Sequence, residues 1–142
     1  VMEMVDLAAE QAPPGLCQKV ATEMGTEKDS DELERQVNNC LKSGLLQRAR
    51  ASGACWREVP YCVRKGDELQ EGRMDLLFKE HDRLVVVDYK SDRVREEVIP
   101  ARLEHYRGQG EAYQKAAMAA AGAKEVEVWL LFAGPGVEKR LA

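Results

Sequence analysis

The sequence predicts an α/β domain in which helices cover both faces of a mixed β-sheet. The N-terminal third carries apolar residues at helical spacing, and the middle of the chain holds apolar runs separated by short polar turns. A long helical stripe and a further apolar run follow these strands. The predicted order is helices, then strands, then one long helix and another strand. This order is typical of the α/β class.

The expected helices cover 1–11, 16–24, 30–41, 45–50 and 101–121, and the expected strands cover 55–63, 72–78, 84–90, 126–132 and 137–142. Pro13 and Pro14 end the first helix, and Ser30 or Asp29 caps the third. We expect one domain over 1–142, with a helical segment over 1–53 and an α/β core over 54–142. Because the first helical stripe starts without a capping signal, we also expect a fragment of a longer chain.

Composition narrows the class of protein. The 142 residues are 44% hydrophobic and 32% charged, with a net charge of −4. An acidic balance disfavours a free-standing nucleic-acid binder, but it is compatible with an enzyme whose carboxylates hold metal ions. We find no signal peptide, no apolar run of membrane-spanning length and no Walker motif, so we expect a cytoplasmic protein without membrane contact or an ATP site.

The cysteines form no Cys-x-x-Cys pair; they are Cys17, Cys40, Cys55 and Cys62. At these spacings a zinc site or an iron–sulfur cluster is not expected. We interpret them as reduced thiols.

The stretch from Gly72 to Asp92 reads as a β-hairpin with charged residues inside apolar strands. If the turn is 80–83, Asp75 lies opposite Asp88 on one face, with Cβ atoms about 4.5–5.5 Å apart. Two carboxylates at that distance repel unless a cation or a shared proton compensates. A slip of one residue would put them on opposite faces.

The same register sorts the neighbouring side chains. The face of the two aspartates also receives Arg73, Leu77, Val86 and Lys90. The other face pairs apolar and aromatic residues, namely Met74 with Tyr89, Leu76 with Val87 and Phe78 with Val85.

Two interpretations of the charged face remain open. Asp75 and Asp88 offer the hard oxygen ligands that suit Mg²⁺ or Mn²⁺, with Lys90 beside them to orient a water or balance charge on a phosphate. The alternative is a cross-strand salt-bridge cluster that also includes Arg73. The apolar residues on either side favour a site, because burying charge without a partner costs free energy.

Several motifs together resemble the signature of RecB-family nucleases in the PD-(D/E)XK superfamily. The motifs are Gly72-x-x-Asp75, Asp88-Tyr89-Lys90-Ser91-Asp92 and Gln109-x-x-x-Tyr113. The segment from Trp56 to Tyr61 resembles the first-strand pattern of the C-terminal nuclease domain in AddA- and RecB-type bacterial helicase–nucleases.

The resemblance implies a restriction-endonuclease-like fold and a role for each matching residue. Asp75, Asp88 and the main-chain carbonyl of Tyr89 would bind Mg²⁺ or Mn²⁺, and Lys90 would be the catalytic lysine. Glu58, Gln109 and Tyr113 would support the site. For Glu58 the alternative is a surface strand residue, and for Gln109 and Tyr113 it is a helix–sheet contact.

The resemblance also implies a biological setting. The chain would act as a magnesium-dependent DNA exonuclease. It would be part of an ATP-dependent helicase–nuclease that works in double-strand break repair and recombination. The partners would be single-stranded DNA delivered by a helicase, the helicase domains of the parent chain and a second nuclease or helicase subunit. The histidine ligand of the family falls just before Val1, so we expect truncation there and a fragment short of one metal ligand.

Two other functions stay open. One is a nuclease-derived module that binds DNA or protein without cutting. The other is a different RecB-like nuclease of the phage or CRISPR-associated kind.

Overall fold

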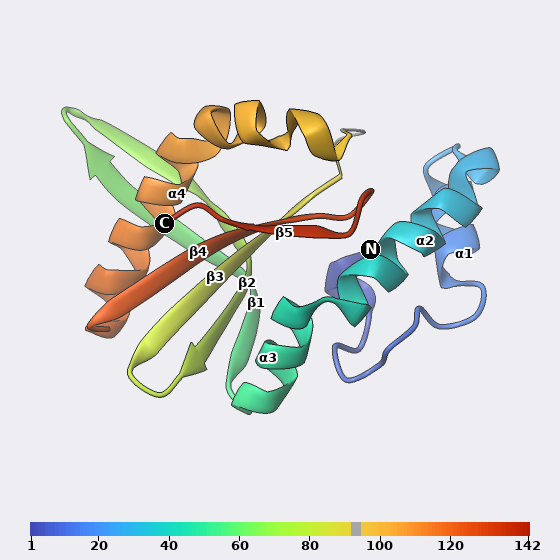
Figure 1. The fold of residues 1–142 in the computed structure, drawn as a ribbon, viewed down its shortest axis with the longest axis horizontal. Helices are drawn as coiled ribbons and strands as arrows, with labels where there is room; N and C mark the ends of the chain where they lie inside the picture. The colour runs from blue at the N-terminus through green and yellow to red at the C-terminus, as the bar shows by residue number, and fades with distance from the viewer. Residues whose placement is uncertain (92–94) are drawn as a thin grey trace.

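The computed structural model describes residues 1–91 and 95–142, apart from the side chain of Glu27, so Asp92 of the predicted motif lies outside it. Its elements in chain order (Figure 1) are η1 Met2–Met4, α1 Leu16–Glu23, η2 Glu27–Asp29, α2 Ser30–Lys42, α3 Gly44–Ser52, β1 Cys55–Lys65, β2 Glu68–Glu80, β3 Arg83–Lys90, η3 Glu96–Val98, α4 Ile99–Ala121, β4 Glu125–Phe132 and β5 Val137–Arg140.

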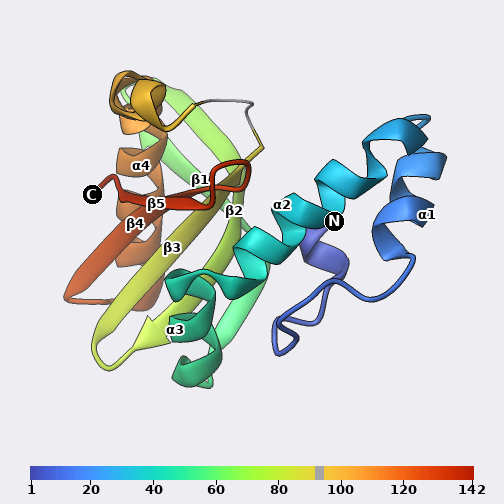
Figure 2. The ribbon, with the colours of Figure 1, turned by 45° about the vertical axis from the view of Figure 1, so that its right-hand side comes forward.

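Within the described residues the sheet has five strands in the order β1-β2-β3-β4-β5. Strands β3 and β4 run parallel, and the other neighbours are antiparallel. The parallel pair needs a crossover, and α4 provides it along one face. Helices α2 and α3 lie on the other face (Figure 2). The predicted α/β class with a mixed sheet between helices is therefore confirmed.

Each face of the sheet has its own apolar core. Leu76, Phe78, Val85 and Val87 pack with residues of α2 and α3. On the α4 side, Leu84 and Val86 pack with Tyr113 and Ala117. Side chains therefore alternate along β3 between the two cores, as expected of a strand buried on both faces.

The predicted hairpin register is confirmed where the β2–β3 ladder exists. Leu77 pairs with Val86, and Lys79 pairs with Leu84. The ladder closes at Glu80 and Arg83, and His81 in the turn adopts a left-handed φ of 53°. The paired stretch then ends at Leu76 and Val87, one residue short of the two aspartates.

The placement of Met74 on the face of Tyr89 is wrong. Met74 packs with Leu84 and Val86 on the α4 side, although Leu76 packs on the α2 side. The alternation breaks at Asp75, which lies opposite the unpaired Glu58, whose φ is 52°. A left-handed residue inside a strand is the backbone signature of a local irregularity, and sequence periodicity does not reveal it.

The helix expected over 1–11 is also wrong, since the structure has only the short 3₁₀ turn Met2–Met4 there. The carboxylate of Asp6 accepts the backbone N–H of Ala8 at 2.9 Å, a local bond that competes with helix formation. The segment is held by arginines instead. Arg57 Nη1 donates to the carbonyl of Val5 at 2.5 Å, and Arg50 donates to the carbonyl of Leu7.

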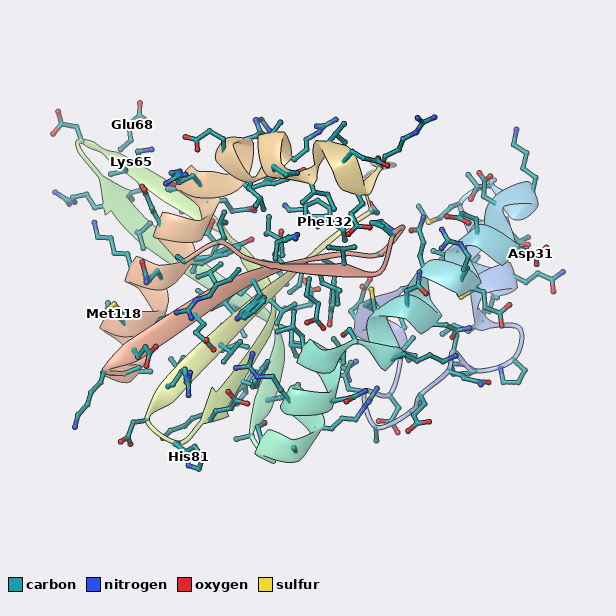
Figure 3. All side chains as sticks on the ribbon, in the orientation of Figure 1. Asp31, Lys65, Glu68, His81, Met118 and Phe132 are labelled. Atoms are coloured by element: carbon teal, nitrogen blue, oxygen red, sulfur yellow. The ribbon has the colours of Figure 1, made fainter. Side chains whose placement is uncertain are left out.

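In the described part of the chain, none of the helices combines the length and the apolar character needed to span a bilayer. Many charged side chains project from the surface of the molecule (Figure 3).

Candidate active site

Two carboxyl groups meet where β2 and β3 stop pairing. Asp88 is only 4% exposed, and its carboxylate lies close enough to that of Asp75 to raise the pKa of Asp75. Oδ2 of Asp75 accepts the backbone N–H of Tyr89 at 2.8 Å. This side-chain bond holds Asp75 against β3 at the point where the ladder has ended.

The surroundings of Asp75 shift the pKa of its carboxyl group. Burial raises the pKa of Asp75 to about 7, and the hydrogen bond and charge of Asp88 act in the same direction. The N–H of Tyr89 opposes this rise in pKa. Near neutral pH the Asp75 carboxyl is therefore poised between its protonated and its ionised form.

Lys90 is the cation that contacts this pair. Its ammonium nitrogen lies 2.5 Å from Asp88 Oδ2 and donates to Gln109 Oε1 at 3.0 Å. The ring of Tyr106 covers the same nitrogen, with 4.1 Å between Nζ and the ring centroid. These contacts, each from a different direction, fix the position of the Lys90 ammonium.

Helix α4 extends the network to Asp88. Gln109 Nε2 donates to Tyr113 Oη at 2.9 Å, and Tyr113 Oη lies 3.1 Å from Asp88 Oδ1 and 3.2 Å from the carbonyl of Arg73. Burial and the charge of Asp88 raise the pKa of Tyr113, so its hydroxyl keeps its proton and donates. The spacing of four residues puts Gln109 and Tyr113 on one helical face, as predicted.

Glu58 approaches from the strand on the other side. It lines a cavity of about 240 Å³ together with Asp75, Tyr89 and Val1. Its charge adds to the rise in the Asp75 pKa. The predicted side chains thus form a chain of neighbours across β1, β2, β3 and α4: Glu58 lies near Asp75, and Lys90, Gln109 and Tyr113 are linked to Asp88 by their contacts.

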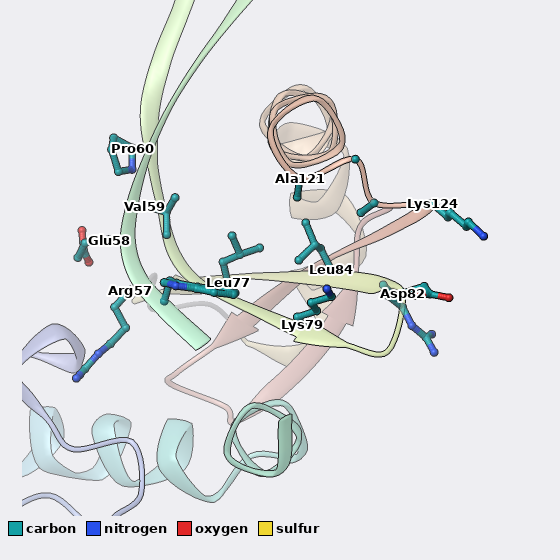
Figure 4. A pocket seen from close by; sticks show the side chains of 14 residues that line it. Arg57, Glu58, Val59, Pro60, Leu77, Lys79, Asp82, Leu84, Ala121 and Lys124 are labelled. Atoms are coloured by element: carbon teal, nitrogen blue, oxygen red, sulfur yellow. The ribbon is translucent and has the colours of Figure 1, made fainter. Parts of the chain in front are cut away.

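A wider groove of about 610 Å³ lies elsewhere, beside the C-terminal end of α4. Leu77, Leu84 and Ala121 line it (Figure 4), and Glu58 borders both hollows. Asp75, Asp88 and Lys90 do not line this groove. The size of a cavity therefore does not mark the chemistry in this molecule.

The donor set fits a small hard cation. Asp75 and Asp88 supply carboxylate oxygens, and in the part of the chain that the structure describes one lysine leaves their combined charge only partly balanced. Among residues 1–91 and 95–142, no cluster of three or more acidic, histidine or cysteine side chains is arranged to hold a metal. Mg²⁺ commonly takes one or two protein carboxylates and completes its shell with water and phosphate oxygens, so two carboxylates fit it.

Tyr106 and Tyr61 also belong to this network, although neither was predicted as a site residue. Tyr106 precedes Gln109 by three residues and so lies on the same face of α4, a signal that was available. Tyr61 packs edge-on against Tyr113, with 5.2 Å between ring centroids. Its role depends on a contact between a strand and a helix that no local motif shows.

The chain belongs to the PD-(D/E)XK nuclease superfamily, whose family model matches residues 2–141. Its relatives include large bacterial proteins. It is 28% identical, over 94% of its length, to an ATP-dependent helicase/nuclease subunit of Thermoanaerobacter sp. (strain X514). It is 33% identical, over 82% of its length, to the protein of the same name in Desulforudis audaxviator. The aligned parts make up 13% and 11% of these relatives.

Proposed function

We propose that this chain is the nuclease unit of a helicase–nuclease and hydrolyses phosphodiester bonds of DNA with the help of a divalent metal ion. The observation that carries this proposal is the pair of the buried Asp88 and the half-buried Asp75, whose charge Lys90 balances only in part. The family and the names of the relatives support the reaction class.

In this proposal Asp75, Asp88 and the main-chain carbonyl of Tyr89 hold Mg²⁺, or Mn²⁺ in its place. Such an ion, when bound, polarises the scissile phosphate and lowers the pKa of a water molecule. Lys90 orients the attacking water and offsets the negative charge that develops on the phosphate. Gln109 holds Lys90, and Tyr113 holds Asp88, through their hydrogen bonds.

Glu58 has a supporting role in the proposal. It lines the same cavity as Asp75 and adds negative charge to the carboxylate pair. We infer that it raises the preference of the site for a cation.

The wider setting is part of the same proposal. Residues 1–142 act as one domain of a longer polypeptide in the bacterial cytoplasm, and a helicase motor feeds them a DNA single strand. A second nuclease or helicase subunit completes the machine, which processes broken DNA for repair and recombination. The relatives are named as helicase/nuclease subunits, which supports this setting.

The direct test is digestion of labelled single-stranded DNA by the chain with Mg²⁺ or Mn²⁺. The parent is expected to cut only with metal, and the separate variants Asp88→Ala and Lys90→Ala are expected to lose at least ~100-fold in rate. Glu127→Gln, which changes another carboxylate with 4% exposure, is the matched control and should still cut. Equal cutting by Asp88→Ala and the parent would contradict the proposal.

A second arm of this test adds residues before Val1. Because Val1 lines the cavity that contains Asp75, a histidine placed directly upstream would enter beside the carboxylates. A variant extended by such a histidine is expected to bind Mn²⁺ more tightly than one extended by alanine. Equal affinity would argue against a histidine ligand at this place.

One observation favours a second candidate, a nuclease-derived module that binds without cutting. The described residues bring only two carboxylates together with Lys90, and no third metal-binding side chain joins them. DNA binding by the extended chain, with no cleavage in either metal, would support this candidate over the nuclease.

A further inference from the structure

Two residues of the sequence motifs lie outside the charged cluster around Asp88. Tyr61 ends the first-strand pattern that begins at Trp56, and Gly72 opens the Gly-x-x-Asp motif that ends at Asp75. They are directly opposed in the antiparallel β1–β2 ladder. Opposed residues on one face of such a pair contact each other, so the two motifs meet at this point.

The ring of Tyr61 lies across Gly72. A Cβ atom on Gly72 would come within 2.7 Å of Tyr61 Oη, 2.8 Å of Cε1 and 2.9 Å of Cζ. The φ of Gly72 is not in the left-handed region, so backbone conformation does not demand glycine here. The need for glycine comes from the space that the Tyr61 ring occupies.

The other contacts of Tyr61 lead to the carboxylate pair. The ring meets Tyr113 edge-on, at an interplanar angle of 86° and with 5.2 Å between centroids. Tyr113 is 2% exposed, and its hydroxyl lies 3.1 Å from Asp88 Oδ1. A displacement of the Tyr61 ring would therefore reach Asp88 through one intervening side chain.

We propose that Tyr61 is a positioning residue of the nuclease site: its ring, seated on Gly72, braces Tyr113 so that the Tyr113 hydroxyl holds the Asp88 carboxylate. This inference rests on the proposed function for its effect on cleavage. It assigns Gly72 the role of a seat for the ring. The competing explanation is that Tyr61 only fills the α4-side core, where Val59 also packs.

The two explanations differ in what a substitution does to Asp88. If Tyr61 only fills space, Tyr61→Leu lowers the melting temperature and leaves the surroundings of the Asp88 carboxyl unchanged. If Tyr61 is a brace, Tyr61→Leu and Tyr113→Phe disturb the same hydrogen bond, and their combination does no more than either alone.

The experiment follows the carboxyl ¹³C resonance of Asp88 by NMR in the metal-free chain. Tyr61→Leu and Tyr113→Phe are expected to shift it to similar positions, and the double variant to shift it no further. Gly72→Ala should shift it too, because the added methyl displaces the ring, and this covers the case in which Tyr61→Leu fails to fold. Tyr61→Phe keeps the ring, and Trp56→Leu alters an exposed aromatic on the same strand; both should leave the resonance in place.

Cleavage of single-stranded DNA is the second measurement. The expected loss is about tenfold for Tyr61→Leu and little for Tyr61→Phe, a hydrogen-bond-sized effect. The proposed role of Tyr61 would be contradicted if the Asp88 resonance moved in neither Tyr61→Leu nor Gly72→Ala. It would also be contradicted if the shifts caused by Tyr61→Leu and Tyr113→Phe added in the double variant. A parent that cuts no DNA would instead defeat the proposed function, while the resonance still decides the role of Tyr61.

Discussion

Two buried carboxylates on neighbouring strands have opposite surroundings. Glu127 on β4 and Asp88 on β3 are each 4% exposed. Arginines surround Glu127. The distances from its carboxylate oxygens are 2.8 Å to an Nη atom of Arg48, 3.2 Å to one of Arg140 and 3.5 Å to one of Arg83. Asp88 meets a second carboxyl, that of Asp75, and Lys90 as its cationic neighbour.

This difference is the reason for proposing a site at Asp88 and a structural ion cluster at Glu127. Among the described residues, the three arginines around Glu127 are balanced by three carboxylates, because Arg48 also binds Glu80 and Arg140 also pairs with Glu125. The two hydrogen bonds to Glu80 raise the pKa of Arg48. Nothing among the contacts of Glu127 calls for another cation. Around Asp88 the described residues place the single cation Lys90 against two carboxyls, and a divalent ion would correct this imbalance. Burial is equal in the two places, so charge compensation is the feature that distinguishes them.

The largest expected effect is on cleavage by Asp88→Asn. This change keeps the shape of the side chain and removes the charge, so the rate on single-stranded DNA should fall at least ~100-fold. The metal-free variant should stay folded, because the change relieves repulsion with Asp75. A melting curve and a cleavage rate measured on one preparation check the folding and the activity of the variant. Normal cleavage by Asp88→Asn would contradict the proposed difference between Asp88 and Glu127.

The next effect is on stability, by Glu127→Gln. Loss of the anion leaves the arginines facing one another without a carboxylate between them. We expect the free energy of unfolding to fall by roughly 2 kcal/mol. The loss would be larger if the cluster were fully buried, but its arginines are partly exposed. Denaturant unfolding measures this loss. Mn²⁺ affinity should not change; weaker Mn²⁺ binding by Glu127→Gln would show that the two centres are coupled.

Metal affinity should depend on pH through Asp75. Because the pKa of Asp75 is raised to about 7, a bound ion must displace its proton at lower pH. The apparent affinity for Mg²⁺ is expected to rise about tenfold from pH 6 to pH 8, with release of a proton. Calorimetry in two buffers of different ionisation enthalpy measures both quantities. An affinity that is flat across this range would mean that Asp75 is already ionised at pH 6.

The stability of the metal-free chain should have the opposite pH dependence at this group. The pKa of Asp75 is higher in the folded chain than in the unfolded one, so the folded state binds more protons between pH 3.8 and about 7. Its contribution is complete below that window and is lost as pH rises through 7. The free energy of unfolding of the parent minus that of Asp75→Asn, measured across this pH range, isolates the contribution of Asp75. This difference should fall as pH rises through 7, and a rise would contradict the prediction.

The smallest effect concerns Tyr106. Tyr106→Leu removes the ring over the Lys90 ammonium and should slow cleavage about two- to fivefold, the size of a partly exposed cation–π contact. Tyr106→Phe keeps the ring and should recover most of the rate. If the leucine and phenylalanine variants behave alike, the ring has no part in holding Lys90.

Periodicity was sufficient to predict most of the fold. The register of Leu77 with Val86 followed from an assumed turn at 80–83, and the β2–β3 ladder has that register. Periodicity failed at Asp75 and Met74, where the strand is irregular, and over 1–11, where arginines bind backbone carbonyls in place of helical bonds. Both failures depend on contacts distant in sequence.

The sequence predicted which side chains would lie near one another, and it predicted less of how they are connected. The spacing of Asp88 and Lys90, and of Gln109 and Tyr113, placed these side chains on common faces in advance. The raised pKa of Asp75 depends on burial and on the meeting of two strands, which only the fold supplies. The contact between Tyr61 and Gly72 likewise needs the β1–β2 register.

The central claim is that the uncompensated pair, and not the Glu127 cluster, takes a divalent ion. The most direct measurement is the anomalous difference map of a crystal of this chain soaked in Mn²⁺. We expect a peak in contact with the carboxylates of both Asp75 and Asp88, and its loss in Asp88→Asn. A peak elsewhere that survives this substitution, or no peak beside the pair at saturating Mn²⁺, would contradict the claim.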